Sequence, residues 1–118
     1  MKEIKKACVL HVFESLEELP LEVLNLMKAA IKARAKAYAP YSKFQVGAAL
    51  LLDNNVVVTG NNLENASYPS GLCAERTAIY YTGSQYPKAK ILKMAISASS
   101  IKKPTSKPIP PCGACRQA

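Results

Sequence analysis

Three cysteines and one glutamate constrain this chain more than any other feature of its sequence. Cys73 lies two residues before Glu75, and the pair Cys112 and Cys115 follows directly after Pro111. Two thiolates in a Cys-x-x-Cys pair can bind one metal ion, and a third thiolate leaves the fourth position of a tetrahedral zinc ion open for water. The pattern therefore predicts a zinc site with three cysteine ligands and a carboxylate beside it, which is an arrangement suited to hydrolysis.

An alternative is a closed structural zinc site. Cys8 or His11 would then supply a fourth ligand, and Glu75 would be an ordinary acid of a first helical turn. Structural sites usually combine two paired ligand sets, whereas this chain has one Cys-x-x-Cys. We therefore favour the open site. We expect Cys8 to be a small buried side chain and His11, the only histidine, to lie outside the site.

Arg76 lies one helical turn after Cys73. Three thiolates leave excess negative charge on a zinc site, which weakens the metal as a Lewis acid. We expect Arg76 to donate hydrogen bonds to the thiolate sulfurs and to supply compensating positive charge. The alternative for Arg76 is a surface ion pair.

The length of 118 residues fits one small domain, whose stability should depend on a metal and on contacts between subunits. The longest apolar run, near residues 48–52, is far too short to cross a membrane, and residues 1–13 make a poor signal peptide. We therefore expect a cytoplasmic protein with no membrane partner. Its four cysteines are then metal ligands or buried thiols rather than disulfides.

The net charge of +8 could indicate a polyanion partner. However, the lysines are spread along the chain, in no run longer than two, and no basic stripe is interleaved with aromatic residues. We therefore predict no nucleic-acid partner.

The first half of the chain predicts a strand, a helix and a hairpin. Residues 7–14 are rich in β-forming side chains and suggest a short edge strand. Ser15 is a plausible N-cap of a helix that extends to about Tyr38, with a lysine-rich solvated face opposite its apolar stripe. Residues 46–52 and 56–60 flank a turn and predict a β-hairpin.

The second half places the cysteines at helix starts. Residues 61–71 are rich in turn formers and lead to a helix over 73–82, with Gly83 as its stop. The apolar run 91–98 predicts a central strand, and a further helix should begin at Cys112 after a proline-rich loop. Unpaired N–H groups at helix starts favour thiolates. The expected fold is therefore α/β, a mixed β-sheet with helices packed on it and a zinc site at two helix N-termini.

Four sequence blocks agree in order and spacing with one known family. These blocks are YSKFQVGAAL (41–50), NLENASY (62–68), CAERTA (73–78) and PCGACRQ (111–117). The metal pattern alone resembles zinc-dependent deaminases in general. Together the four blocks closely resemble the small, homotetrameric cytidine deaminases of pyrimidine salvage. The likeness extends from about residue 39 to the last residue.

The resemblance implies hydrolytic deamination of cytidine and deoxycytidine to uridine and deoxyuridine, with release of ammonia. It implies that Cys73, Cys112 and Cys115 bind zinc and that Glu75 moves protons between water and the base. The backbone of Ala74 would meet the base edge.

The resemblance also assigns the remaining substrate contacts. Phe44 would contact the pyrimidine, and Asn62 and Glu64 would hydrogen-bond the ribose 3′-hydroxyl. A sugar hydroxyl needs both a donor and an acceptor, which agrees with the second assignment. The alternative is that Asn62 and Glu64 only hold the long turn together.

Tyr68 would contribute to a neighbouring active site across a subunit interface. Tyr80 and Tyr81, on the helix that follows, would extend the same aromatic surface, and packing within one chain is the alternative. Family members continue after the Cys-x-x-Cys helix with further strands. We therefore expect residues 1–118 to form a single cytidine-deaminase-like domain that lacks its C-terminal strands.

Two other functions remain open. One is a deaminase of another cytosine-containing substrate, such as a nucleotide or a polynucleotide base. Glu64 would repel a 3′-phosphate and no aromatic platform is evident, so a free nucleoside is favoured. The other is a non-catalytic zinc-stabilised module that binds nucleic acid through its positive charge.

Overall fold

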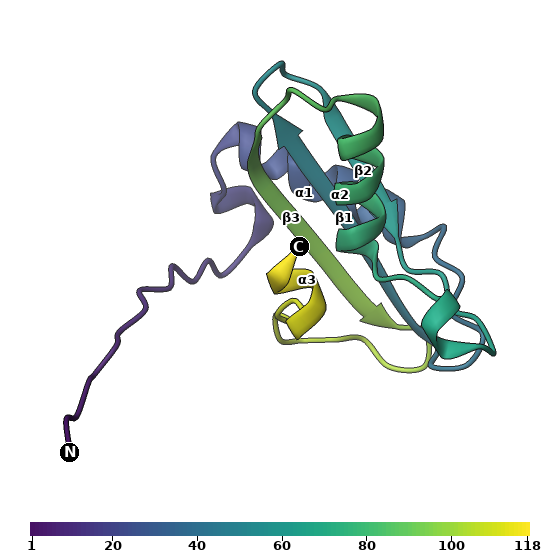
Figure 1. Cartoon of the computed structure of the whole chain (residues 1–118), viewed down its shortest axis with the longest axis horizontal. Coiled ribbons are helices and arrows are strands. Elements are labelled where there is room, and N and C mark those ends of the chain that lie inside the picture. The colour runs from purple at the N-terminus through teal and green to yellow at the C-terminus, as the bar shows by residue number, and fades with distance from the viewer.

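The computed structural model describes residues 1–118 and contains one three-stranded antiparallel sheet in the order β2-β1-β3. The central strand is β1 (Phe44–Leu52), which pairs with β2 (Val57–Asn61) on one side and β3 (Ile91–Ser100) on the other. Helix α1 (Leu21–Arg34) covers one face and α2 (Ala74–Gln85) covers the other, as Figure 1 shows. The predicted α/β arrangement of helices packed on a sheet is confirmed, although the pairing among these three strands is antiparallel rather than mixed.

Alternation along β1 gives the sheet two apolar faces, because successive side chains of a strand point in opposite directions. The cluster between the sheet and α1 consists of Leu26, Ala30, Ala49 and Ala95. The cluster between the sheet and α2 consists of Leu50, Leu52, Val58 and Ala78. Even-numbered residues of β1 therefore face α2, and odd-numbered residues face α1.

Both helices approach the sheet closely at a glycine. A Cβ atom at Gly47 would lie only 2.1 Å from the backbone oxygen of Ala30 in α1. A Cβ atom at Gly60 would lie 2.6 Å from the backbone oxygen of Ala74 in α2. Because Gly60 has no side chain, the first turn of α2 can lie directly on β2.

The prediction of a strand at residues 7–14 is wrong. This segment extends away from the sheet and is exposed throughout (Figure 1). A strand is stable only when its backbone groups pair with a neighbour, and no other strand lies beside this segment. Cys8 is likewise exposed rather than buried.

The first long helix is shorter than predicted at both ends. Leu19 is extended (ψ 143°), because the following Pro20 disfavours the helical region for its predecessor. Ser15 therefore precedes only a 3-10 turn, Leu16–Glu18, and makes no side-chain cap. At the other end, Tyr38 donates its N–H to the Asn62 carbonyl, which draws residues 35–38 out of the helix.

Two further boundaries differ from the prediction. Gly83 does not end α2, because its backbone remains helical and the helix continues to Gln85, shortly before Pro87. Strand β3 lies at an edge of the sheet rather than at its centre, and its residues 91–94 are exposed. A 3-10 turn (Tyr68–Ser70) precedes α2, and the short helix α3 (Gly113–Gln117) ends the described chain. No helix combines the length and apolar composition needed to cross a membrane.

The glycine contacts generate a stability prediction. Gly47→Ala should lower the free energy of unfolding by about 2–3 kcal/mol, because the new methyl group overlaps the backbone of α1. Gly83→Ala is the matched control. Its methyl group meets no atom within 4 Å in an exposed helix, so it should raise stability by about 0.5–1 kcal/mol. Urea unfolding measures both changes. Equal unfolding midpoints for the two variants would contradict the predicted close packing at Gly47.

Candidate metal centre

The three predicted cysteine ligands meet at one point, although they come from distant parts of the sequence. The Sγ atom of Cys112 lies 3.9 Å from that of Cys73 and 3.5 Å from that of Cys115. All three sulfur atoms lie within 4.8 Å of one another. Sulfurs bound tetrahedrally to one zinc ion, each at about 2.3 Å, would be about 3.8 Å apart. The spacing and the soft thiolate donors therefore fit zinc.

Helix starts position two of these cysteines. Cys73 is the N-cap of α2 and Cys112 is the N-cap of α3, and both have extended backbones. Side chains two residues apart on a regular helix point about 200° apart. Because Cys73 lies just outside the helix, its side chain and that of Glu75 can share one site.

Local structure shifts the acidity of the thiols in opposite directions. Backbone N–H groups at the start of α3, above all that of Cys115, lower the pKa of the Cys112 thiol. Burial raises the pKa of Cys115 to about 12, and the negative charge of Glu75 contributes to this rise. Cys115 therefore needs a nearby cation to become a thiolate near neutral pH, and a zinc ion bound by three sulfurs supplies one.

Arg76 supplies positive charge at the same point. Its Nη2 atom donates to the Cys73 sulfur at 3.5 Å. The side chains of Cys73 and Cys115 hold the pKa of the Arg76 guanidinium above its ordinary value. The Nε atom of Arg76 is buried without a hydrogen-bond partner. The guanidinium is thus directed at sulfur atoms rather than at a carboxylate.

A cavity of about 170 Å³ opens beside Cys73 and Cys112. Strands β1 and β3, the start of α2 and the loop before α3 form its wall. Apart from the two cysteines, the lining residues are Val46, Asn62, Ala74, Glu75, Ile96, Ala98, Ile109 and Pro110. Its wall is therefore mainly apolar, with polar groups at a few positions, as is typical of small-molecule sites.

Glu75 is the buried acid of this cavity. This residue is only 6% exposed and lies in the first turn of α2. The group that could hold a metal consists of Cys73, Cys112 and Cys115 and does not include Glu75. Glu75 therefore lines the cavity beside these cysteines without being part of the group that could hold a metal.

The other predicted site residues divide into two groups. Asn62 and Ala74 line the cavity with Glu75. Phe44 and Glu64 are half-buried and lie outside the lining, and Tyr68 is 91% exposed. The structure thus brings the first group together with the cysteines, whereas it leaves the second group around the cavity or at the surface.

Sequence reasoning missed the apolar wall. Val46 could have been found, because it lies two residues after Phe44 and points to the same face of β1. Ile109 and Pro110 directly precede the Cys112 segment in the chain. Ile96 and Ala98 carry no comparable signal, since their place in the wall depends on pairing between β1 and β3.

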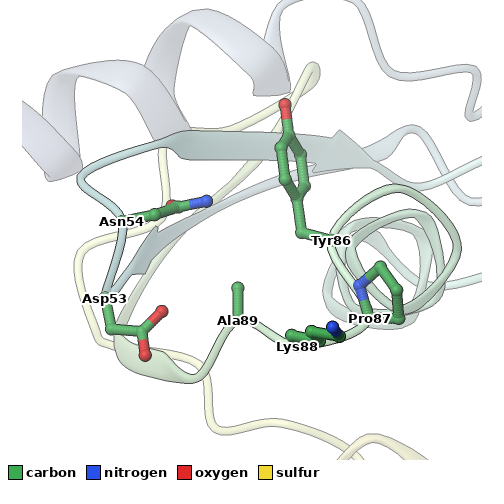
Figure 2. A pocket seen from close by; sticks show the side chains of 6 residues that line it. All are labelled: Asp53, Asn54, Tyr86, Pro87, Lys88 and Ala89. Atoms are coloured by element: carbon green, nitrogen blue, oxygen red, sulfur yellow. The ribbon is translucent and has the colours of Figure 1, made fainter.

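A second, larger hollow of about 350 Å³, here called the distal hollow, lies at the end of α2 opposite the cysteines (Figure 2). Its lining residues are Asp53, Asn54, Tyr86, Pro87, Lys88 and Ala89. Figure 2 shows Asn54 and Tyr86 on opposite sides of the hollow. Asp53 accepts from the Lys90 N–H, and Asn54 accepts from the Val56 N–H. Asp53 and Asn54 therefore support the backbone of the neighbouring turns. No thiol or histidine lines this hollow, so the smaller cavity is the candidate site.

Known proteins with similar sequences point to one family. Residues 22–118 match the family described as the cytidine and deoxycytidylate deaminase zinc-binding region. A cytidine deaminase of Halalkalibacterium halodurans is 50% identical over 92 residues, which cover 78% of this chain and 65% of that protein. A cytidine deaminase of Sporosarcina psychrophila is 41% identical over 97 residues, which cover 82% of this chain and 67% of that protein. The chain thus spans about two thirds of the length of these relatives.

Solved structures give the same result. The crystal structure of cytidine deaminase from Burkholderia pseudomallei has a TM-score of 0.70 at 44% identity, over 84% of this chain and 73% of that chain. The corresponding enzyme from Mycobacterium tuberculosis has a TM-score of 0.70 at 39% identity, over 83% and 75%.

The metal centre generates a prediction about zinc retention. We expect one zinc ion per chain. Arg76→Gln should weaken zinc binding about 10- to 100-fold, because it removes a donor and a positive charge from beside the thiolates. Competition with a chelator measures the zinc affinity.

Arg34→Gln is the matched control for this experiment. The Arg34 guanidinium donates to the Ser97 hydroxyl at 2.8 Å, on the face of the sheet that α1 covers. Zinc affinity should therefore be unchanged in this variant. A protein without zinc, or an Arg76→Gln variant with normal affinity, would contradict the prediction.

Proposed function

Because the chain belongs to the family of the cytidine and deoxycytidylate deaminase zinc-binding region, we propose that it hydrolyses cytidine and deoxycytidine to uridine and deoxyuridine. Ammonia is the second product. The observation that carries the proposal is the buried carboxylate of Glu75, which shares a cavity with two of three clustered cysteines. The resemblance to proteins named cytidine deaminase supports the choice of substrate.

The roles of the residues follow from this chemistry. Cys73, Cys112 and Cys115 hold the zinc ion, and Arg76 offsets their negative charge. Bound zinc supplies the Lewis acidity that makes water a nucleophile near neutral pH. Glu75 accepts one proton from the attacking water and donates it to N3 of the base. It then accepts the second water proton, from the hydroxyl group now on C4, and delivers it to the departing amine. The bond from C4 to oxygen forms, the bond from C4 to nitrogen breaks, and one carboxylate serves as base and acid in turn.

The substrate contacts extend from the same centre. The backbone of Ala74 meets the base edge, and Phe44 contacts the pyrimidine from the start of β1. Asn62 and Glu64 hydrogen-bond the ribose 3′-hydroxyl. The support is the position of Asn62 and Ala74 in the cavity wall and of Phe44 on the same face of β1 as Val46.

We place this activity in pyrimidine salvage in the cytoplasm. All four cysteines are free thiols, which suits a reducing compartment. The partners are then a small nucleoside and further copies of the chain, without nucleic acid or membrane.

Replacement of Glu75 tests the proposed chemistry. Glu75→Gln should lower kcat about 100- to 10,000-fold, because an amide of the same shape cannot move protons. Zinc content should stay unchanged, because Glu75 holds no metal. The measurement is ammonia release from cytidine, deoxycytidine, their monophosphates and adenosine.

Glu22→Gln is the control, because Glu22 pairs with Lys93 on the surface and neither residue lines the cavity. It should leave turnover unchanged. Ammonia release only from monophosphates would favour the other cytosine-containing substrates. Salt-dependent nucleic-acid binding without ammonia release would favour the non-catalytic module. Loss of zinc from Glu75→Gln would contradict the proton-transfer role.

We further propose that the functional unit is a homotetramer in which a neighbouring chain completes each site. The cavity is small, and a nucleoside must be shielded from bulk water by more surface than these loops provide. Tyr68 is 91% exposed, and Tyr80 and Tyr81 are each 54% exposed on α2. Exposed aromatic side chains of this kind are suited to subunit interfaces, which are usually closed and symmetric.

Replacement of Tyr68 tests this assembly. Tyr68→Ala should weaken association and raise KM together, because the same side chain contributes to the interface and to the neighbouring site. Tyr68→Phe keeps the ring and should retain most of the assembly. Light scattering and steady-state kinetics measure the two effects. A monomer that deaminates cytidine efficiently would contradict the tetramer.

A further inference from the structure

The side chain of Asn62 is bonded to the backbone of β1. Its Oδ1 atom accepts the Val46 N–H at 2.8 Å, and its Nδ2 atom donates to the Phe44 carbonyl at 2.9 Å. The backbone N–H of Asn62 also donates to the Val46 carbonyl at 3.2 Å. Both polar atoms of the side chain therefore hold the start of β1.

The side chain of Glu64 holds the residues just before that point. Its Oε1 atom accepts the N–H groups of Tyr41 and Ser42, each at 3.1 Å. Hydrogen bonds from Ser42, above all from its side chain, lower the pKa of Glu64 below its usual value. The carboxylate is therefore charged near neutral pH, and one of its oxygens is already committed to the protein.

The end of β2 explains why these side chains are needed. Pairing between β1 and β2 ends at Gly47 and Asn61, so the chain before Gly47 has no strand partner on that side. Unpaired backbone groups in a partly buried position are costly. Asn62 supplies partners for the Phe44 carbonyl and the Val46 N–H, which are half-buried, and Glu64 ties the exposed N–H groups of Tyr41 and Ser42 just before β1. We call these four side-chain bonds the 62/64 clamp.

The clamp acts on the wall of the candidate site. Val46 lines the cavity, and Phe44 lies two residues earlier on the same face of β1. A shift of residues 41–46 would therefore move Phe44 and Val46 relative to Glu75. Errors of about 1 Å in such positions can reduce catalysis about 100-fold.

We propose that Asn62 and Glu64 are positioning residues that place Phe44 and Val46 through the 62/64 clamp, independently of any contact with ribose. This inference rests on the proposed nucleoside deamination. Each side chain retains capacity for a ribose hydroxyl, because Nδ2 has a second hydrogen and Oε2 is not used in the clamp. The clamp therefore serves a substrate whether or not it has a 3′-hydroxyl.

Paired substrates separate the two roles. Asn62→Ala and Glu64→Ala are assayed with cytidine and with 3′-deoxycytidine, alongside the unaltered protein. Positioning predicts that kcat/KM falls about 10- to 100-fold even on 3′-deoxycytidine, which has no 3′-hydroxyl to contact, with much of the loss in KM; the proposed ribose contact adds a further loss on cytidine only. A ribose contact alone predicts a loss on cytidine and unchanged kinetics on 3′-deoxycytidine, which would overturn the proposal.

Amide hydrogen exchange provides a readout that does not depend on activity. In Glu64→Ala the Tyr41 and Ser42 amides should exchange at least about tenfold faster, and in Asn62→Ala the Val46 amide should do so. Unchanged exchange at these amides would overturn the clamp. If the unaltered protein released no ammonia, the proposed function would fail, whereas exchange would still decide whether the clamp holds the segment.

Matched variants exclude a general loss of stability. Glu64→Gln keeps a side-chain oxygen that can accept the N–H groups of Tyr41 and Ser42. It should therefore recover most of the kcat/KM that Glu64→Ala loses. Asn54→Ala removes an asparagine that accepts the Val56 N–H in the distal hollow, and it should change neither kinetics nor exchange at residues 41–46. Faster exchange at the core amide of Leu50 together with an unchanged KM would indicate global destabilisation and contradict positioning.

Discussion

The close approach of α2 to the sheet is the contact on which the rest of the site depends. Gly60 has no side chain, so the backbone of Ala74 can lie against β2. This contact fixes the first turn of α2, and therefore Cys73 at its N-cap and Glu75 inside the cavity. Strand β3 and the following loop then bring Cys112 to the same point from the other side. A side chain at Gly60 would push the start of α2 away from β2. Cys73 and Glu75 would then move together, away from Cys112 and Cys115.

The three thiols also impose an electrostatic requirement. The start of α3 favours the Cys112 thiolate, whereas burial disfavours the Cys115 thiolate. Three negative sulfurs within 4.8 Å of one another are stable only beside positive charge. Zinc supplies most of that charge when bound, and Arg76 supplies the remainder from one helical turn away. Metal binding therefore releases protons from the cysteines and stabilises the junction between α2 and α3.

Short polar side chains serve as backbone partners at both ends of the sheet. Near the distal hollow, Asp53 and Asn54 bind N–H groups of neighbouring turns. Near the cavity, Asn62 and Glu64 do the same for residues 41–46. The difference lies in what the held segment carries. At the distal hollow the segment that is held is only a turn. At the cavity the held segment includes Val46, which forms part of the wall beside the buried Glu75.

The metal ligands, the hairpin and the two helix starts could be predicted from the sequence, because ligand spacing, alternation and turn residues are local properties. The start of α1 after Pro20 is also a local property of the sequence, because proline disfavours a helical residue before it. The capping pattern at Ser15 nevertheless favours an earlier start, which the structure does not show. Other features depended on residues distant in the chain. Residues 7–14 have the composition of a strand but no partner, and only the order β2-β1-β3 places 91–98 at an edge.

The same distinction holds within the site. The residue types and spacing of Cys73, Glu75 and Cys112 predicted that thiols and an acid would gather at one point, and the structure places Glu75 in the cavity beside Cys73 and Cys112. The bonds from Asn62 to β1, and from Glu64 to the residues just before β1, were decided only by tertiary structure, since they join segments about 20 residues apart in the chain. The sequence by itself thus determined which groups could react, and the pairing of distant strands decided which side chains surround them.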